Sequence, residues 1–360
     1  MPARKPKEDR VFDRQTFLKT VNFDKPDRIL MTFHINSSCW NNYPCEALWD
    51  LQESHPILFP NFKRPAELKV DHIPEAWKDK PFTDPWGCVW ETTMDGITGS
   101  VHQHPLADLT NLESYRPPDP NKTDGRWPVD WQAVKQNLAQ ASNAGLLPEY
   151  AIPHGHTFLR LVDLRGYENL LFDMVDDDPR LHRLIDMIEQ FNLGVVDNII
   201  RSGAELVLYP EDLGMQTGPM LSPEHFRKYI KPSYKRIMEP ARRKGCLIHM
   251  HSDGDIRLLA DDLIEDGVKI LNLQDLVNGI DWIAENLVGK VAIELDLDRQ
   301  TVTPKGTPAQ IDDLVRTEVQ RLGSKEGGLM MIYGLYPGVP LANAKAVMDA
   351  MEKYSTYYSG

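Results

Sequence analysis

The stretch LIHMHSDGD, residues 247–255, holds the residue types and spacing most suited to chemistry. His249 and His251 lie two residues apart at the end of an apolar run, and Asp253 follows at the same interval. Residues two apart in a β-strand point to the same side, so these side chains are expected to face one way. Imidazole nitrogens and a carboxylate oxygen in that geometry suit Zn²⁺ in a catalytic site with three protein ligands. A polar cluster without metal and a pair of packed histidines are the alternative interpretations.

Short apolar runs of the kind that form buried strands must position these residues. From about residue 147 such runs alternate with amphipathic helical patterns, which predicts parallel strands covered by helices. Two further runs near the N-terminus raise the number to eight, the count of a (β/α)8 TIM barrel. The eight runs are DRILMTFHI, LKVDHIP, EYAIPHG, ELVLYPED, CLIHMHSDG, VKILNLQD, KVAIELDLD and GLMMIYG.

Helix boundaries carry recognisable signals. Ser222 before Pro223 predicts a helix start, as does Thr307 with Pro308 and Gln310, the latter as a capping box. Two prolines, Pro232 and Pro240, are expected to kink or split the helix that begins after Ser222.

Residues 35–130 are rich in Trp, Pro and turn residues and are predicted to elaborate the N-terminal part of the barrel. Within them, CVWETTMDGITGSVHQH shows the alternation and the Asp-Gly turn of a β-hairpin. No stretch is long enough to be a linker, so residues 1–360 are predicted to form a single barrel domain.

Active sites of barrels form at the carboxyl ends of the strands. Six of the eleven histidines fall at the predicted strand ends, where a divalent cation or a polar substrate would compensate the buried charge. Glu211, at a neighbouring strand end, can reach the same point as His251 and Asp253, so these three are the predicted metal ligands. Cys39, His249 and Asp296 are alternatives to Glu211.

Composition excludes several function classes. The chain has 40 Lys and Arg against 53 Asp and Glu, a formal charge of −13, which argues against nucleic acid or an anionic membrane as partner. No apolar run approaches the roughly 18 residues of a membrane helix, and no signal peptide is evident, so the expected location is cytoplasmic. The four cysteines lack CxxC spacing and are predicted to be reduced thiols.

The stretch from EDLGMQTGPMLSPEHF through GCLIHMHSDGDIRLLADDLIEDGVKILNLQ resembles the core of the uroporphyrinogen decarboxylase superfamily, and weaker similarity continues to about residue 353. The resemblance implies a (β/α)8 barrel, in agreement with the strand count. Decarboxylases of porphyrinogens carry an arginine-rich segment after the first strand, where this chain reads FHINSSCWNNYP without arginine. The resemblance therefore favours another branch, the corrinoid-dependent methyltransferases.

Those methyltransferases hold zinc in a His-x-Cys…Cys site. Here His251 matches the histidine, Asp253 stands in the first Cys position, and no thiol stands near Tyr333 to Leu335. A harder nitrogen and oxygen site suits an oxygen-bearing substrate. The resemblance thus implies an O-demethylase component, in which Zn²⁺ activates a methyl ether such as a methoxylated aromatic.

The methyl acceptor is expected to be cob(I)alamin on a separate, small corrinoid protein, because no DxHxxG cobalamin signature occurs in the chain. The residues predicted to act in catalysis are His251, Asp212 and His154, and those predicted to contact substrate are His34, Trp40 and Tyr333. A metal-independent decarboxylase or lyase, and a non-catalytic small-molecule binding protein, are the alternative functions.

Overall fold

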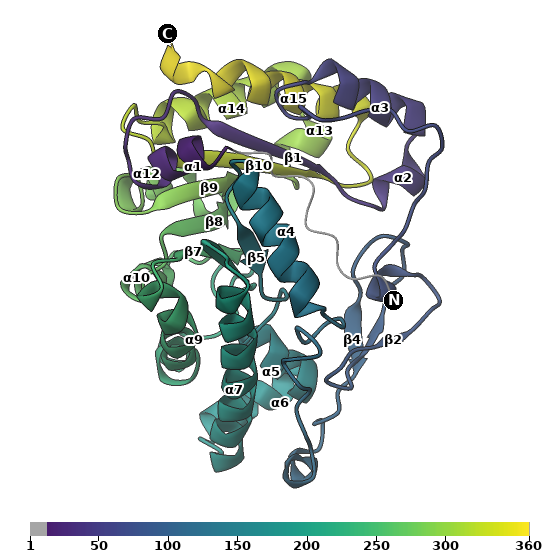
Figure 1. Ribbon diagram of the computed structural model, residues 1–360, viewed down its shortest axis with the longest axis vertical. Coiled ribbons are helices and arrows are strands. Elements are labelled where there is room, and N and C mark those ends of the chain that lie inside the picture. Colours follow the sequence, from purple (N-terminus) through teal and green to yellow (C-terminus); the bar gives the residue numbers. More distant parts are fainter. Residues whose placement is uncertain (1–12, 360) are drawn as a thin grey trace. The chain divides into compact units, whose positions relative to one another are not determined.

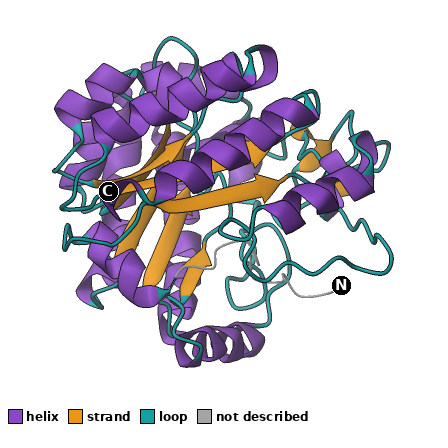
Figure 2. Ribbon diagram, turned by 90° about the horizontal axis from the view of Figure 1, so that it is seen from above, coloured by secondary structure: helices purple, strands orange, loops and turns teal. Residues whose placement is uncertain are grey.

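The computed structural model describes residues 13–359. Along the chain, strands alternate with helices, the pattern of an α/β protein (Figure 1 and Figure 2). Seven strands are hydrogen-bonded in the order β1-β10-β9-β8-β7-β6-β5, and the pairs β1–β10, β10–β9, β5–β6 and β6–β7 are parallel. The fold is thus of the TIM-barrel type, as predicted. The strands are β1 (Leu30–Ile35), β5 (Glu149–Ala151), β6 (Leu206–Pro210), β7 (Leu247–Ser252), β8 (Ile270–Gln274), β9 (Ala292–Asp296) and β10 (Leu329–Leu335).

The predicted strand LKVDHIP, residues 68–74, is wrong: within residues 13–359 this segment has no strand, and a short 3₁₀ helix, Pro74–Ala76, begins at its end. Every second residue from 69 to 73 is exposed, whereas all five residues of β8 and of β9 are buried. Strands of a parallel sheet are covered on both faces, so they need a continuous apolar run. Lys69, Asp71 and the exposed Ile73 interrupt such a run here.

The predicted β-hairpin is present within a second, three-stranded sheet with the order β2-β3-β4. Its strands are β2 (Phe82–Thr83), β3 (Val89–Glu91) and β4 (Ser100–Gln103), and β2 pairs with β3 in antiparallel fashion. The Asp95–Gly96 turn lies between β3 and β4, and Gly96 has a φ of +85°. That left-handed conformation explains the glycine at this position.

Contacts divide the described chain into two compact units, each assembled from separate segments. The first comprises residues 81–90 and 100–272, and the second comprises the described residues before 81, residues 91–99 and those from 273 onward. The single-domain interpretation stays a prediction.

The first unit holds β5, β6 and β7, and its helices α7 and α9 pack side by side (Figure 1). Ser222 caps α8, as predicted. Asp178 caps α7, whose first residue is Pro179. A π-helix, Phe226–Ile230, separates α8 from α9, so the helix after Ser222 is interrupted before Pro232, and Pro240 lies within α9. The helices are α4 (Trp131–Asn143), α5 (Phe158–Arg165), α6 (Tyr167–Val175), α7 (Pro179–Arg201), α8 (Pro223–His225), α9 (Lys231–Arg243) and α10 (Ala260–Glu265), with a 3₁₀ helix at Leu109–Glu113.

The second unit holds β1, β9 and β10, and its helices α14 and α15 pack against each other (Figure 1). Thr307 and Gln310 form the predicted capping box at the start of α14. The helices are α1 (Arg14–Val21), α2 (Cys39–Asn42), α3 (Cys45–Ser54), α11 (Asp275–Asn278), α12 (Ile280–Asn286), α13 (Val302–Lys305), α14 (Pro308–Leu322) and α15 (Leu341–Ser355), with a 3₁₀ helix at Tyr357–Ser359.

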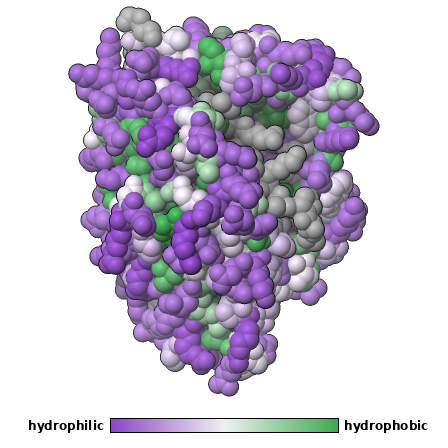
Figure 3. All heavy atoms as spheres, viewed as in Figure 1, coloured by the Kyte–Doolittle hydropathy of each residue, from purple (hydrophilic) through white to green (hydrophobic). Residues whose placement is uncertain are grey.

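Hydrophilic residues predominate on the face that Figure 3 shows, and hydrophobic residues there form small, scattered groups. None of the helices within residues 13–359 combines the length and the apolar character needed to span a membrane.

Candidate functional site

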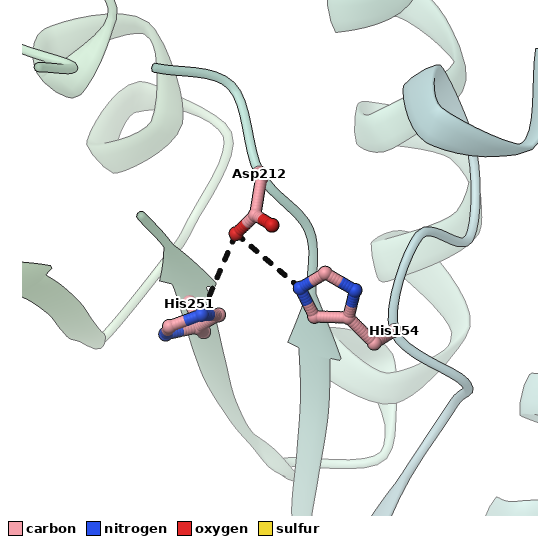
Figure 4. Close-up of side chains that lie close together, drawn as sticks. All are labelled: His154, Asp212 and His251. Carbon is pink, nitrogen blue, oxygen red and sulfur yellow. Dashed lines mark ion pairs between the residues drawn. The ribbon is translucent and has the colours of Figure 1, made fainter. Parts of the chain in front are cut away.

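Three side chains from successive strand ends of the first unit converge on one point (Figure 4). His154 follows β5, Asp212 follows β6, and His251 is the fifth residue of β7. Asp212 Oδ1 lies 3.3 Å from His154 Nε2 and 3.6 Å from His251 Nε2. One nitrogen or oxygen atom from each of the three residues lies within 4.8 Å of the others. We call these three residues the His-Asp-His cluster.

The spacing of the His-Asp-His cluster fits a divalent cation. Two ligands about 2.1 Å from a tetrahedral Zn²⁺ are about 3.4 Å apart, close to the 3.3 and 3.6 Å observed. The donor set of two imidazole nitrogens and one carboxylate oxygen is one that catalytic zinc uses, with a fourth position left for water or substrate. The side chains of His154, Asp212 and His251 are 44%, 28% and 21% exposed, so a small molecule can reach the cluster.

The cluster holds one firmly ionised carboxylate. Burial by itself raises the pKa of Asp212, but the hydrogen bond and charge of His154 and the charge of His251 outweigh burial and hold that pKa well below its ordinary value. Burial lowers the pKa of His154 too, yet Asp212 outweighs this effect and raises it. For His251 burial prevails and lowers the pKa, despite nearby Asp253 and Asp212. Asp212 is therefore an anion at neutral pH.

Asn272 orients the imidazole of His251. Its Oδ1 lies 2.5 Å from His251 Nδ1 and can only accept, so Nδ1 donates this hydrogen bond, and Nε2 lies 3.6 Å from Asp212 Oδ1. Histidines that bind metals are commonly held in this way by a hydrogen bond to the other ring nitrogen. Asn272 belongs to β8. It lies within the run VKILNLQD, and the sequence did not indicate this role.

Two loops that carry the site residues are in direct backbone contact. Asp212 Oδ1 accepts the backbone N–H of Asp253 at 3.0 Å, and Gly214 N donates to Asp253 O at 3.2 Å. Gly254 has a φ of +80°, and a Cβ at this residue would lie 2.1 Å from the carbonyl carbon of Gly214. Only glycine allows both this conformation and this approach. The Gly in HSDG therefore allows the loop after β7 to pack against the loop after β6.

The expected ligand set, Glu211, His251 and Asp253, differs from the cluster in two of its three members. Glu211 is fully buried, and its carboxylate accepts backbone N–H bonds from Thr157, Phe158 and Leu159, at the start of α5. These bonds turn its oxygens toward the helix terminus, so Asp212, the next residue along the chain, takes the place beside His251.

Asp253 stands outside the cluster, although it is close to it. Its Oδ1 is 3.9 Å from His251 Nε2 and its side chain is 39% exposed. His154 and Asp212, which the sequence placed in catalytic roles, complete the cluster instead.

The residues predicted to contact substrate lie in the second unit. His34 is in β1 and Trp40 in α2, both partly exposed. Tyr333 is fully buried in β10, where its hydroxyl donates to Thr303 Oγ1 at 3.1 Å and its ring packs on Phe33. Tyr333 thus has a packing role in the described structure, and substrate contact by His34 and Trp40 stays a prediction.

The other ligands that the sequence left open have different surroundings. Cys39 is buried, its thiol donates to Leu335 O, and burial raises the pKa of this thiol to about 12. Asp296 accepts a hydrogen bond from Arg299 at 2.7 Å. His249 is buried within β7. All four cysteines are free, as predicted.

The structure also reveals supporting residues that the sequence did not indicate. Arg126 is buried, stacks 3.9 Å from the centroid of Trp90 and donates to the carbonyl oxygen of His154 at 3.2 Å. Tyr234 of α9 donates to Glu211 at 2.6 Å. Both residues lie far in sequence from their partners, and no local pattern connects them.

Comparisons with known proteins identify the family to which the chain belongs. The family model described as uroporphyrinogen decarboxylase (URO-D) matches residues 87–354. A uroporphyrinogen decarboxylase of Thermus thermophilus is 25% identical over 269 residues, which cover 71% of this chain and 72% of the relative. Another, of Trichlorobacter lovleyi, is 22% identical over 274 residues, covering 73% and 75%.

Among solved structures, a methyltransferase from Methanosarcina mazei has a TM-score of 0.66 and 16% identity, and the match covers 95% of this chain and 98% of the other. At 16% sequence identity, this comparison shows that the two proteins share a fold. The family match covers well over half of the chain and includes the whole His-Asp-His cluster. The resemblance inferred from the sequence is confirmed, and the chain belongs to the uroporphyrinogen decarboxylase (URO-D) family of enzymes.

Proposed function

We propose that the chain is a metal-dependent methyltransferase, which moves a methyl group from a methyl ether to the cob(I)alamin of a separate corrinoid protein. The observation that carries this proposal is the His-Asp-His cluster, whose atoms have the spacing and chemistry of a three-ligand zinc site. The fold shared with a methyltransferase agrees with it. A methoxylated aromatic is the substrate class that we favour.

In this proposal His154, Asp212 and His251 hold Zn²⁺. Bound there, the ion supplies a Lewis acid that polarises the ether oxygen and stabilises the charge of the leaving phenolate. Asp212 stays ionised because His154 and His251 lower its pKa, and Asn272 keeps Nε2 of His251 turned toward Asp212. The partial exposure of the cluster leaves one side open to substrate.

The transfer is balanced without an oxidant or a reductant. The carbon–oxygen bond of the ether breaks, and its electron pair stays on the oxygen. Cob(I)alamin contributes the pair for the new cobalt–carbon bond and becomes methylcobalamin. His34 and Trp40 are proposed to contact the aromatic ring, the latter by stacking.

The donor chemistry supports an oxygen-bearing substrate. Carboxylate and imidazole form a harder site than thiolates, and harder donors suit a metal that binds oxygen. Within residues 13–359 no cysteine belongs to the cluster, and the thiol of Cys39 is held protonated by its burial.

A metal-free decarboxylase is the second candidate, favoured by the names of the curated relatives. In that case the His154–Asp212 ion pair would act in general acid–base catalysis. Release of CO₂ from candidate acids, with activity unchanged by a chelator, would support this candidate.

The methyltransferase proposal is tested by incubating zinc-loaded protein with free cob(I)alamin and a set of methoxylated aromatics. We expect methylcobalamin and the demethylated phenol to form in equal amounts, and an Asp212→Asn variant to form neither. Equal turnover by wild-type protein and Asp212→Asn would contradict the methyltransferase proposal.

A further inference from the structure

Glu211 occupies the N-terminus of α5, although it comes from a different part of the chain. Its Oε2 accepts the backbone N–H groups of Thr157 at 3.1 Å and Phe158 at 2.9 Å, and its Oε1 accepts that of Leu159 at 3.0 Å. The N-cap residue Thr157 makes no side-chain capping hydrogen bond of its own. Glu211 therefore satisfies amide groups that a helix leaves unpaired at its start.

A fourth donor completes the surroundings of this carboxylate. The hydroxyl of Tyr234, fully buried in α9, donates to Glu211 Oε2 at 2.6 Å. Oε2 thus accepts three hydrogen bonds, from Thr157, Phe158 and Tyr234, and Oε1 accepts one, from Leu159. These four donors hold the carboxylate at the start of α5, and Glu211 is not one of the three residues of the His-Asp-His cluster.

The contacts of Glu211 tie together the two segments that carry His154 and Asp212. His154 lies three residues before Thr157, and Asp212 follows Glu211 directly. Two backbone hydrogen bonds lie at the same place: Gly155 N donates to Pro210 O, and Glu211 N donates to His251 O, each at 3.0 Å. The segments that follow β5 and β6 are thereby held in register with β7.

We propose that Glu211 is a positioning residue of the metal site: by fixing the N-terminus of α5, it holds His154 against Asp212. This inference rests on the function proposed above for the His-Asp-His cluster. Outer partners that orient metal ligands commonly change metal affinity about 10–100-fold when they are mutated.

The test compares Glu211→Gln with a matched control, Glu189→Gln. Glu189 is also a buried glutamate of the first unit, but its carboxylate binds Arg236 of α9, at 2.7 and 2.6 Å, and contributes nothing to the cluster. Each variant is examined without metal, by the NMR cross-peak of the His154 ring, assigned with His154→Gln. Each is then titrated with Co²⁺, whose visible spectrum reports coordination geometry.

We expect Glu211→Gln to shift the His154 cross-peak and to weaken Co²⁺ binding about 10–100-fold, whereas Glu189→Gln does neither. An unchanged His154 cross-peak and unchanged Co²⁺ affinity in Glu211→Gln would overturn the inference. Should Glu211→Gln fail to fold, Tyr234→Phe removes one of the four donors and is expected to give smaller changes in the same direction; their absence would also overturn it. Wild-type protein that binds no Co²⁺ would refute the proposed function, while the metal-free cross-peak would still decide the role of Glu211.

Discussion

Replacing Gly254 by alanine tests whether the loops after β6 and β7 must lie in direct contact for the cluster to form. Gly254 has a φ of +80°, and its new Cβ would lie 2.1 Å from the carbonyl carbon and 2.2 Å from the carbonyl oxygen of Gly214. Carbon atoms in favourable contact are about 3.5–4.0 Å apart. The two backbones must therefore separate by more than about 1 Å.

The expected loss of stability has two parts. A left-handed backbone costs alanine roughly 1–2 kcal/mol, and forcing extra volume into a packed site costs about 1–3 kcal/mol. Gly145→Ala is the matched control, because Gly145 has a φ of +75° and a Cβ added there would meet nothing within 4 Å. Gly145→Ala should lose only the stability that the left-handed backbone costs, whereas Gly254→Ala should lose roughly 2–5 kcal/mol of stability from both effects.

The assay is chemical denaturation of both variants, followed by Co²⁺ titration. We expect Gly254→Ala to bind Co²⁺ at least about 10-fold more weakly, because Asp212 and Asp253 are displaced, and Gly145→Ala to bind it normally. If Gly254→Ala and Gly145→Ala lost the same stability and both kept full affinity, the coupling between the two loops would be refuted.

Three further predictions concern individual side chains. Asn272→Ala should weaken Co²⁺ binding about 10–100-fold, because His251 Nδ1 loses its hydrogen-bond acceptor. Unchanged Co²⁺ affinity in a titration would contradict the role of Asn272 in orienting His251. Cys39 should resist alkylation in native protein at pH 8, because burial raises its pKa to about 12, and rapid labelling seen by mass spectrometry would contradict this. Burial raises the pKa of Asp275 to about 6 and raises that of Glu318 well above its ordinary value. The folded protein then keeps protons that the unfolded chain releases. The free energy of unfolding should therefore fall as pH rises from about 4 through 6 and beyond. Glu318→Gln should lessen that fall in denaturation experiments at pH 5 and pH 8, and parallel pH profiles would disprove it.

The fold was predictable from sequence wherever strands are buried on both faces. The runs that became β8 and β9 are continuous and apolar because helices cover such strands on both sides. The segment LKVDHIP was mistaken for a strand because it was counted among the short apolar runs, although Lys69 and Asp71 interrupt it; the described structure leaves it unpaired in the sheet.

The site was predictable only in part, since strand ends identify candidates without showing which way each side chain turns. Glu211 and Asp212 are adjacent acids, and adjacent residues of an extended segment point to opposite sides. The choice between them depends on the amides of α5 and the hydroxyl of Tyr234, which compete for Glu211. Tyr234 lies 23 residues away along the chain, so no local pattern reveals this competition.

Elemental analysis of zinc is the measurement that tests the central claim most directly. It should be made on wild-type protein purified without chelators, on Asp212→Asn and on Asp253→Asn. We predict about one zinc per chain in the wild type and in Asp253→Asn, and none in Asp212→Asn. Zinc that stays in Asp212→Asn and is lost from Asp253→Asn, or wild-type protein that takes up no zinc when it is offered, would contradict the His-Asp-His cluster as the metal site.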